Sequence, residues 1–276
     1  MPEATPSFEI RPARSWFDFD WREIWEHRGL LGFFVWRGLR IRYRRTLLGV
    51  AWAIIPPVAL MATFTLVFGR VVRIHSEGLP YPVFYFTALV PWLYVSRSVS
   101  DAMSALVAHQ ALINRVYFSR VILPFAAVLS NLADLLFSFA VLAAMLLLYD
   151  FAPSWRLLWL PVLVVLAASA AFGLGLLMAA FNARYRDVRL AAPSLIRLWM
   201  FASPVVYPRS LVNARWRWLY DLNPMSGLIE GFRYALTGAG APPGHALLIA
   251  FSVSAALLVS GFLLFHRVEG ELADVV

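Results

Sequence analysis

Two stretches of this sequence are apolar, free of charge and long enough to cross a lipid bilayer. They run from Thr46 to Gly69 and from Leu157 to Ala183. A helix needs about 20 largely apolar residues to span the hydrocarbon core of a membrane. The whole chain shares this character, because 61% of its residues are hydrophobic and only 14% are charged. A soluble protein has roughly 45–50% apolar and about 25% charged residues, so we expect an integral membrane protein.

Four further stretches have a similar length but contain prolines or isolated charges. They are Gly78–Ser96, Val121–Tyr149, Leu190–Pro208 and Ala246–His266. The prolines of the first of these predict a bent or re-entrant outer end. The sequence therefore predicts an all-α membrane protein, in which residues 46–276 form six transmembrane helices and residues 1–45 form a cytoplasmic tail.

Arginine placement predicts the orientation of these spans. The chain has 24 basic residues, and all of them are arginine. If the N-terminus is cytoplasmic, sixteen arginines lie in segments on the inside and seven in segments on the outside. Basic residues favour the cytoplasmic side of a membrane. We therefore expect a multi-pass protein of the cytoplasmic (inner) membrane with both termini in the cytoplasm.

Two segments outside the spans have the pattern of amphipathic helices. In the N-terminal tail, apolar residues recur every three or four positions from Trp21 to Val35, with charges between them. This pattern predicts a helix in the membrane interface. Between the fifth and sixth spans, Asn223-Pro224 is a favourable helix start and precedes an apolar stripe. We expect short amphipathic or re-entrant helices at that place.

Several kinds of chemistry are excluded or disfavoured by composition. Without lysine there is no P-loop lysine, and without cysteine there is no thiolate metal site. The five histidines show no helical pair, so no metal site is expected. Asp134 and Arg197 are the two charges inside predicted spans, at depths of about 15 and 12 Å from the cytoplasmic side. We expect them to form an ion pair between helices; a polar contact for substrate is the alternative.

Several segments carry a resemblance to a known family. It starts at RYRRTLLGVAWAIIP from Arg42 and continues at PYPVFYFTALVPW from Pro80 and LINRVYFSRVILP from Leu112. It is clearest at ARYRDVRLAAP from Ala183, SPVVYP from Ser203 and WLYDLNPMSGLIEGFRYAL from Trp218. In this order, and over nearly the whole chain, they resemble the membrane (permease) subunit of type-2 ABC exporters for polysaccharides, the family that serves O-antigen, teichoic acid and capsule export. One departure is Phe118-Ser119-Arg120-Val121, where the family commonly has Phe-Pro-Arg-Glu.

The resemblance implies a transport subunit and not an enzyme. It implies a homodimer that works with two separate ATPase subunits, which bind ATP and Mg²⁺, while this chain holds no cofactor. The substrate would be a lipid-linked polysaccharide moved outward across the membrane. The expected partners are therefore a second copy of the chain, the ATPases, the glycan and membrane lipids, with no nucleic acid.

The first proposed site lies just cytoplasmic of the first span. Guanidinium groups bind phosphate in a bidentate manner, and a Leu-Gly step follows them. The residues that would receive the head of the lipid-linked substrate are Arg40, Arg42, Arg44, Arg45, Leu48 and Gly49. The alternative is a determinant of topology that contacts bulk anionic lipid.

The resemblance also implies contacts with the ATPase, a pore and an outer gate. A coupling helix over Ala111–Arg120 and a second cytoplasmic loop would contact the ATPase through Asn114, Arg115, Tyr117, Phe118, Tyr185, Arg186 and Asp187. Aromatic faces suited to sugars would come from Phe64, Phe68, Phe84, Tyr85, Trp92, Tyr94, Trp199, Phe201 and Tyr207. The outer gate would include Asn223, Pro224, Leu228 and Phe232.

Three alternative functions remain open from the sequence. The same fold could export a drug or a simple lipid. A membrane glycosyl- or acyltransferase would need a catalytic carboxylate or histidine at the membrane surface, and Asp101, His109 and Asp187 are the candidates in the inside loops. A secondary carrier usually needs a relay of intramembrane carboxylates, and Asp134 is the only carboxylate in the predicted spans.

Overall fold

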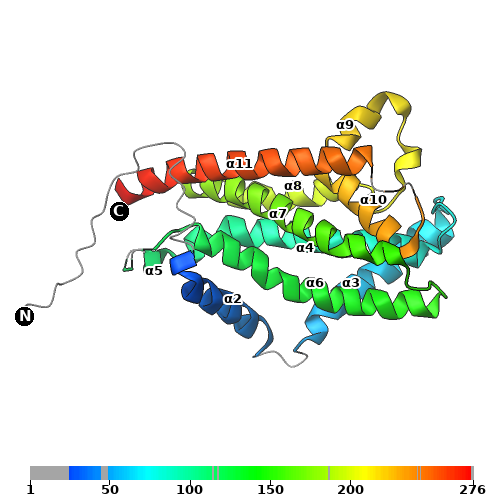
Figure 1. Cartoon of the computed structure of the whole chain (residues 1–276), viewed down its shortest axis with the longest axis horizontal. Helices are drawn as coiled ribbons and strands as arrows, with labels where there is room; N and C mark the ends of the chain where they lie inside the picture. The colour runs from blue at the N-terminus through cyan, green and yellow to red at the C-terminus, as the bar shows by residue number, and fades with distance from the viewer. Residues whose placement is uncertain are drawn as a thin grey trace, which may run out of the picture.

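The protein is a bundle of long helices in which a few segments lie across the two ends (Figure 1). The structure, a computed structural model, describes residues 25–44, 49–113, 115–116, 118–185, 187–240, 242 and 244–274, the side chains of 270–274 excepted. No β-strand occurs in these ranges. The expected all-α membrane architecture is therefore confirmed.

Four long helices run alongside one another and enclose most of the core. They are α4 (Tyr81–Ala108), α6 (Ile122–Leu148), α7 (Trp159–Arg184) and α11 (His245–Asp274). Helix α7 packs against both α4 and α11, and α4 packs against α6. At about 1.5 Å per residue each is longer than the roughly 30 Å hydrocarbon core.

Helix α4 is continuous from its first residue, and Pro91 lies inside it; the bend expected at its outer end stays a prediction. Pro80 is the N-cap, and Pro82 lies in the first turn. Proline is tolerated at these positions because the first N–H groups of a helix have no intrahelical acceptor.

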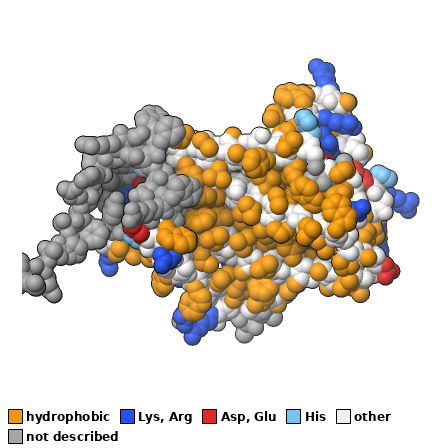
Figure 2. Space-filling model, viewed as in Figure 1, with side chains coloured by type: hydrophobic (Ala, Val, Ile, Leu, Met, Phe, Trp, Pro, Cys, Tyr) orange, Lys and Arg blue, Asp and Glu red, His pale blue; other side chains and the backbone are white. Residues whose placement is uncertain are grey.

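Four predicted spans agree with helices that are long and apolar enough to cross a membrane. These helical stretches are Ala51–Val71, Ile122–Leu148, Trp155–Arg184 and His245–Glu269. The first combines α3 (Ala51–Phe64) with a π-helical turn, η1 (Thr65–Val71), and the third adds the 3₁₀ turn η2 (Trp155–Leu158) to α7. Their outer faces form an apolar surface, and basic side chains lie mainly toward the ends of the molecule (Figure 2).

The other two predicted spans differ from this pattern, so a count of six spans is not confirmed. Helix α4 is long enough but carries Arg97 and Asp101 in its second half. Helix α8 (Asp187–Phe201) has 15 residues, about 22 Å, and residues 202–207 form turns. The expected end of this span at Pro208 is therefore seven residues too late.

Glycine allows two of the long helices to approach closely. A Cβ atom on Gly173 of α7 would lie 2.5 Å from the backbone nitrogen of Leu258 in α11. One on Gly261 of α11 would lie 2.5 Å from the carbonyl oxygen of Gly173. Any larger residue would force these helices apart, and such small-residue contacts are typical of helix packing in membranes.

Short elements lie at opposite ends of the bundle (Figure 1). At one end, α2 (Arg28–Tyr43) leans against α6, and α5 (Gln110–Ile113) follows α4. At the other end, η3 (Arg209–Leu211), η4 (Ala214–Trp216) and α9 (Arg217–Asp221) precede α10 (Pro224–Thr237). A helix in the N-terminal tail, α2, and the short helices before the last span are thus present. The placement of the tail helix in the membrane interface stays a prediction, and the start of its predicted pattern at Trp21 lies outside the described residues.

Candidate functional site

A network of charged and polar side chains joins α2 to the bundle. Arg42 of α2 donates through Nη1 to Asp134 of α6 at 2.5 Å, and through Nη2 to Asp101 of α4 at 3.2 Å. Arg97 of α4 lies 3.1 Å from the same Asp134 oxygen. Tyr43 donates its hydroxyl to the other oxygen. Asp134 is therefore neutralised from two helices, which a carboxylate 13% exposed requires.

This network differs from the expected pair of Asp134 with Arg197. In the structure Arg197 lies on α8, and its Nε donates to the carbonyl of Pro193 one turn earlier at 3.2 Å. Asp134 and Arg197 have similar predicted depths in the membrane, but the depth of a residue within its span does not determine which helices are neighbours. The helix beside Asp134 is α2, which the sequence analysis placed in the membrane interface.

The network forms one wall of a groove of about 300 Å³ between α3, α4, α6 and α8. Its polar side chains include Arg97, Ser100, Asp101, Asn131 and Asp134. The apolar side chains that line it include Trp52, Pro56, Leu60, Pro193 and Ile196 of α3 and α8. A groove that combines charged and apolar side chains suits an amphiphilic ligand.

Sequence analysis missed Arg97, Asp101 and Asn131 as members of this site. Asn131 donates its side-chain amide to Asp101 at 3.1 Å. Arg97 and Asp101 lie beyond the predicted span, which ends at Ser96, but they belong to the same helix because α4 continues to Ala108. Their spacing of four residues was the available signal, because it places both side chains on one helix face.

The arginines proposed to receive phosphate divide into two groups. Arg42 is engaged with two carboxylates, whereas Arg40 and Arg44 are exposed. The Arg40 guanidinium lies 4.8 Å from the centre of the Trp36 ring. Arg45 and Leu48 lie outside the described residues. Gly49 has φ +50°, a left-handed conformation that glycine adopts readily, where the chain turns into α3.

The predicted ATPase contact is partly exposed and partly buried. Helix α5 spans Gln110–Ile113, shorter than expected, and Arg115 beyond it is exposed. Phe118 is 5% exposed and packs against Phe34 of α2. Its ring therefore supports the packing of α2 and is not free to dock on a partner. Asn114, Tyr117 and Arg186 lie outside the described residues, while Tyr185 and Asp187 are exposed.

Four of the nine aromatic residues expected in the pore are buried inside the chain. Phe84 and Tyr85 are fully buried and Trp92 nearly so. Phe64 stacks on Tyr85 with centroids 4.8 Å apart. Phe84, Tyr85 and Trp92 therefore belong to the core, and the partly buried Phe64 packs against it. Phe68 stacks on Phe64, and Trp199 contacts Trp92. Tyr94 lines the groove. Tyr207 donates its hydroxyl to the carbonyl of Phe201, whose side chain is half exposed.

The expected helix start at Asn223-Pro224 is confirmed. The Asn223 side-chain oxygen accepts from the backbone N–H of Met225 at 3.0 Å and from Trp199 Nε1 at 3.0 Å. Its amide donates to Ser203 Oγ at 2.8 Å. The cap thus ties the start of α10 to the end of α8. Pro224, Leu228 and Phe232 are buried in the core behind it.

Comparison with known proteins identifies the family. The sequence profile of the ABC-2 type transporter family matches residues 30–237, which include the groove, the network and α10. This chain belongs to the ABC-2 type transporter family. Family members are transport subunits that work with a separate ATPase, so the expectation of a transport protein, and not an enzyme, is confirmed.

Three relatives of this permease have named substrates or processes. It is 31% identical to the O-antigen export system permease protein RfbA of Myxococcus xanthus, over 92% of this chain and 98% of that protein. It is 22% identical to the protein of the same name in Klebsiella pneumoniae, over 87% of this chain and 92% of that protein. It is 24% identical to the polysialic acid transport protein KpsM of Escherichia coli, over 72% of this chain and 78% of that protein. The predicted resemblance to polysaccharide export permeases is confirmed.

Proposed function

We propose that this chain is the permease subunit of an ATP-driven exporter that moves a lipid-linked polysaccharide outward across the cytoplasmic membrane. Two copies of the chain would form the channel, and two ATPase subunits would bind ATP and Mg²⁺. The names of three relatives support a polysaccharide substrate. Family membership together with the amphiphilic groove is the observation that carries the proposal.

The groove supports a lipid-linked substrate because both charged and apolar side chains line it. Trp52 and Leu60 on α3 line the groove and also have exposed surface, so an acyl or prenyl chain could enter from the side. The Arg97 side chain, which also lines the groove, is 47% exposed, and its charge could bind a phosphate oxygen. Exposed Arg40 and Arg44 would add charge at the membrane surface, where the head group would arrive first.

The arginine-rich end, with α2 and α5, would face the cytoplasm. There Arg115, Tyr185 and Asp187 offer exposed side chains to the ATPase. Helix α10 and the segments before it would then lie at the outer face, as expected for a gate.

Co-purification tests the ATPase part of this proposal. The chain is extracted from its native membrane in mild detergent, and the bound proteins and the ATPase activity of the sample are measured. We expect a stoichiometric ATPase, and Arg115→Glu should reduce its recovery. Arg215→Glu is the matched control, because Arg215 is equally exposed but lies at the opposite end.

A folded chain that purifies without any ATPase would contradict the proposed function. Equal recovery with Arg115→Glu and wild type would contradict the contact but not the function. For the substrate, Arg44→Gln should lower glycan export while leaving membrane insertion intact; unchanged export would refute the role of Arg44.

A further inference from the structure

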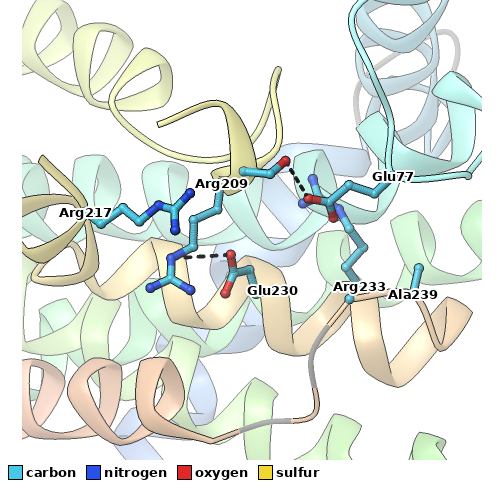
Figure 3. Close-up of a pocket in the computed structure, with 8 residues that line it drawn as sticks. Glu77, Arg209, Arg217, Glu230, Arg233 and Ala239 are labelled. Atoms are coloured by element: carbon cyan, nitrogen blue, oxygen red, sulfur yellow. Dashed lines mark hydrogen bonds and ion pairs between the residues drawn. The ribbon is translucent and has the colours of Figure 1, made fainter. Parts of the chain in front are cut away.

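A second cavity, of about 340 Å³, lies at the end of the bundle opposite to α2 and α5. Three segments of the chain contribute to its wall, around residue 77, within 209–217 and within 230–240. The charged and hydroxyl side chains that line it are Glu77, Arg209, Ser210, Arg217, Glu230 and Arg233 (Figure 3). The cavity is at the small end of the range, roughly 300–1,000 Å³, of small-molecule sites.

The buried member of this set is Arg233 of α10, which is 2% exposed. Its guanidinium lies 3.7 Å from the centre of the Phe84 ring and donates through Nη2 to the Pro204 carbonyl at 2.9 Å. Its Nε has no hydrogen-bond partner among the described residues. Burial lowers the pKa of Arg233 to about 10, so it stays protonated at neutral pH. A fixed, incompletely satisfied cation therefore lines the cavity.

Carboxylates lie among the arginines on the same wall. Glu77 accepts from the Ser210 hydroxyl at 3.0 Å, and in Figure 3 its carboxylate points toward the Arg233 head group. Glu230 lies 3.9 Å from Arg209 Nε, and burial raises the pKa of its carboxyl. Arg209 is also paired with Asp221 outside the cavity.

The remaining cation, Arg217, is exposed. Its Nε donates to the Val212 carbonyl at 3.2 Å. The wall thus presents three guanidinium groups and two carboxylates, together with the Ser210 hydroxyl. Donors and acceptors therefore line the same cavity, some of them in direct contact, as in the Ser210–Glu77 and Arg209–Glu230 pairs.

This mixture of charges restricts the kind of ligand that fits. An anion would be repelled by Glu77 and Glu230, and a cation by the three arginines, whereas a neutral ligand meets neither repulsion. A sugar hydroxyl both donates and accepts, so a neutral polyhydroxyl ligand can satisfy both kinds of group at once. We propose that this cavity binds one or two neutral sugar units of the exported glycan as they leave the permease, an inference that rests on the proposed function.

Saturation-transfer difference NMR on the full chain with its bound ATPase tests the proposal. The probes are glucose, galactose, mannose, rhamnose and N-acetylglucosamine, with glucuronic acid and inorganic phosphate as anionic probes. We expect at least one neutral sugar to bind. In Glu77→Gln its affinity should fall about tenfold or more, since a charged acceptor is lost, and the affinity for glucuronic acid should rise.

Arg217→Gln should lower the affinity for the neutral sugar in the same way, but it should not raise the affinity for glucuronic acid. Arg215→Gln is the matched control, because Arg215 lies two residues away outside the cavity, and it should bind like wild type. Thermal unfolding of each variant verifies that it is folded.

Three results would overturn the inference: no neutral sugar binds to the wild type, the anionic probes bind better than every neutral sugar, or folded Glu77→Gln and Arg217→Gln bind as the wild type does. ATPase activity in the same sample distinguishes a failure of this inference from a failure of the proposed function. An active complex without sugar binding removes only the inference, whereas a folded chain without ATPase removes the proposed function.

Discussion

Replacing Asp134 by asparagine should destabilise the protein, because it removes the charge that neutralises two arginines. Loss of one partner from a buried ion pair costs roughly 3–5 kcal/mol. Here Asp134 is 13% exposed, Arg42 21% and Arg97 47%, so water can compensate part of the loss. We therefore expect a cost of about 2–3 kcal/mol, since exposed pairs contribute less. Asparagine keeps the shape and can still accept one hydrogen bond.

Thermal unfolding of the purified chain in one detergent measures this effect. Each kcal/mol lowers Tm by roughly 2–4 °C in proteins of about this size, so Asp134→Asn should lower it by about 4–12 °C. Asp150→Asn is the matched control. Asp150 is exposed and has φ 59°, a conformation that asparagine also tolerates, so its Tm should not change measurably.

The double variant Arg42→Gln/Asp134→Asn isolates the pair itself. The second substitution should cost less than it does alone, with a coupling of about 1–2 kcal/mol for side chains in direct contact. Arg197→Gln combined with Asp134→Asn should be additive. An unchanged Tm for Asp134→Asn, or strict additivity of the Arg42 and Asp134 variants, would refute the reasoning.

Three further effects are expected. Gly261→Val should lower stability by about 1–3 kcal/mol, because the added atoms meet the Gly173 backbone; thermal unfolding measures it, and wild-type behaviour would contradict the close helix contact. Asn223→Ala should cost about 1–3 kcal/mol, because the helix cap and the acceptor of Trp199 are lost together, and an unchanged Tm would argue against the cap. Burial raises the pKa of Glu230, so folding favours the protonated form of its carboxyl group. Protonation of Glu230 therefore stabilises the protein as pH falls from neutral through the raised pKa, and this stabilisation is lost as pH rises through the same pKa. Glu230→Gln should reduce that pH dependence in a Tm series, whereas an identical series would contradict it.

Apolar runs and helix-capping residues were sufficient to predict much of the fold. Long charge-free runs have few alternatives to a helix, so the spans around α3 and α7 could be predicted. The start of α10 could be predicted because asparagine and proline act on their own first turn. Local chemistry decides such features, and a single sequence contains it.

The candidate site could be predicted only in part, because its partners are far apart in the sequence. Arg42 and Asp134 are separated by 92 positions, and only the packing of α2 beside α6 brings them together. The same packing buries Phe118, which looked like a docking residue. An aromatic residue in the sequence does not indicate whether its ring lies in the core or lines a pore. Phe84 and Tyr85, which are expected in the pore, lie in the core.

Surface glycan in cells that lack this chain tests the central claim most directly. Cells are depleted of the permease, and long-chain polysaccharide is measured at the surface and inside, before and after the wild-type chain is restored. The account predicts that the glycan disappears from the surface, accumulates inside on its lipid carrier, and returns to the surface when the chain is restored. Unchanged surface glycan in the depleted cells would contradict the proposed role in polysaccharide export.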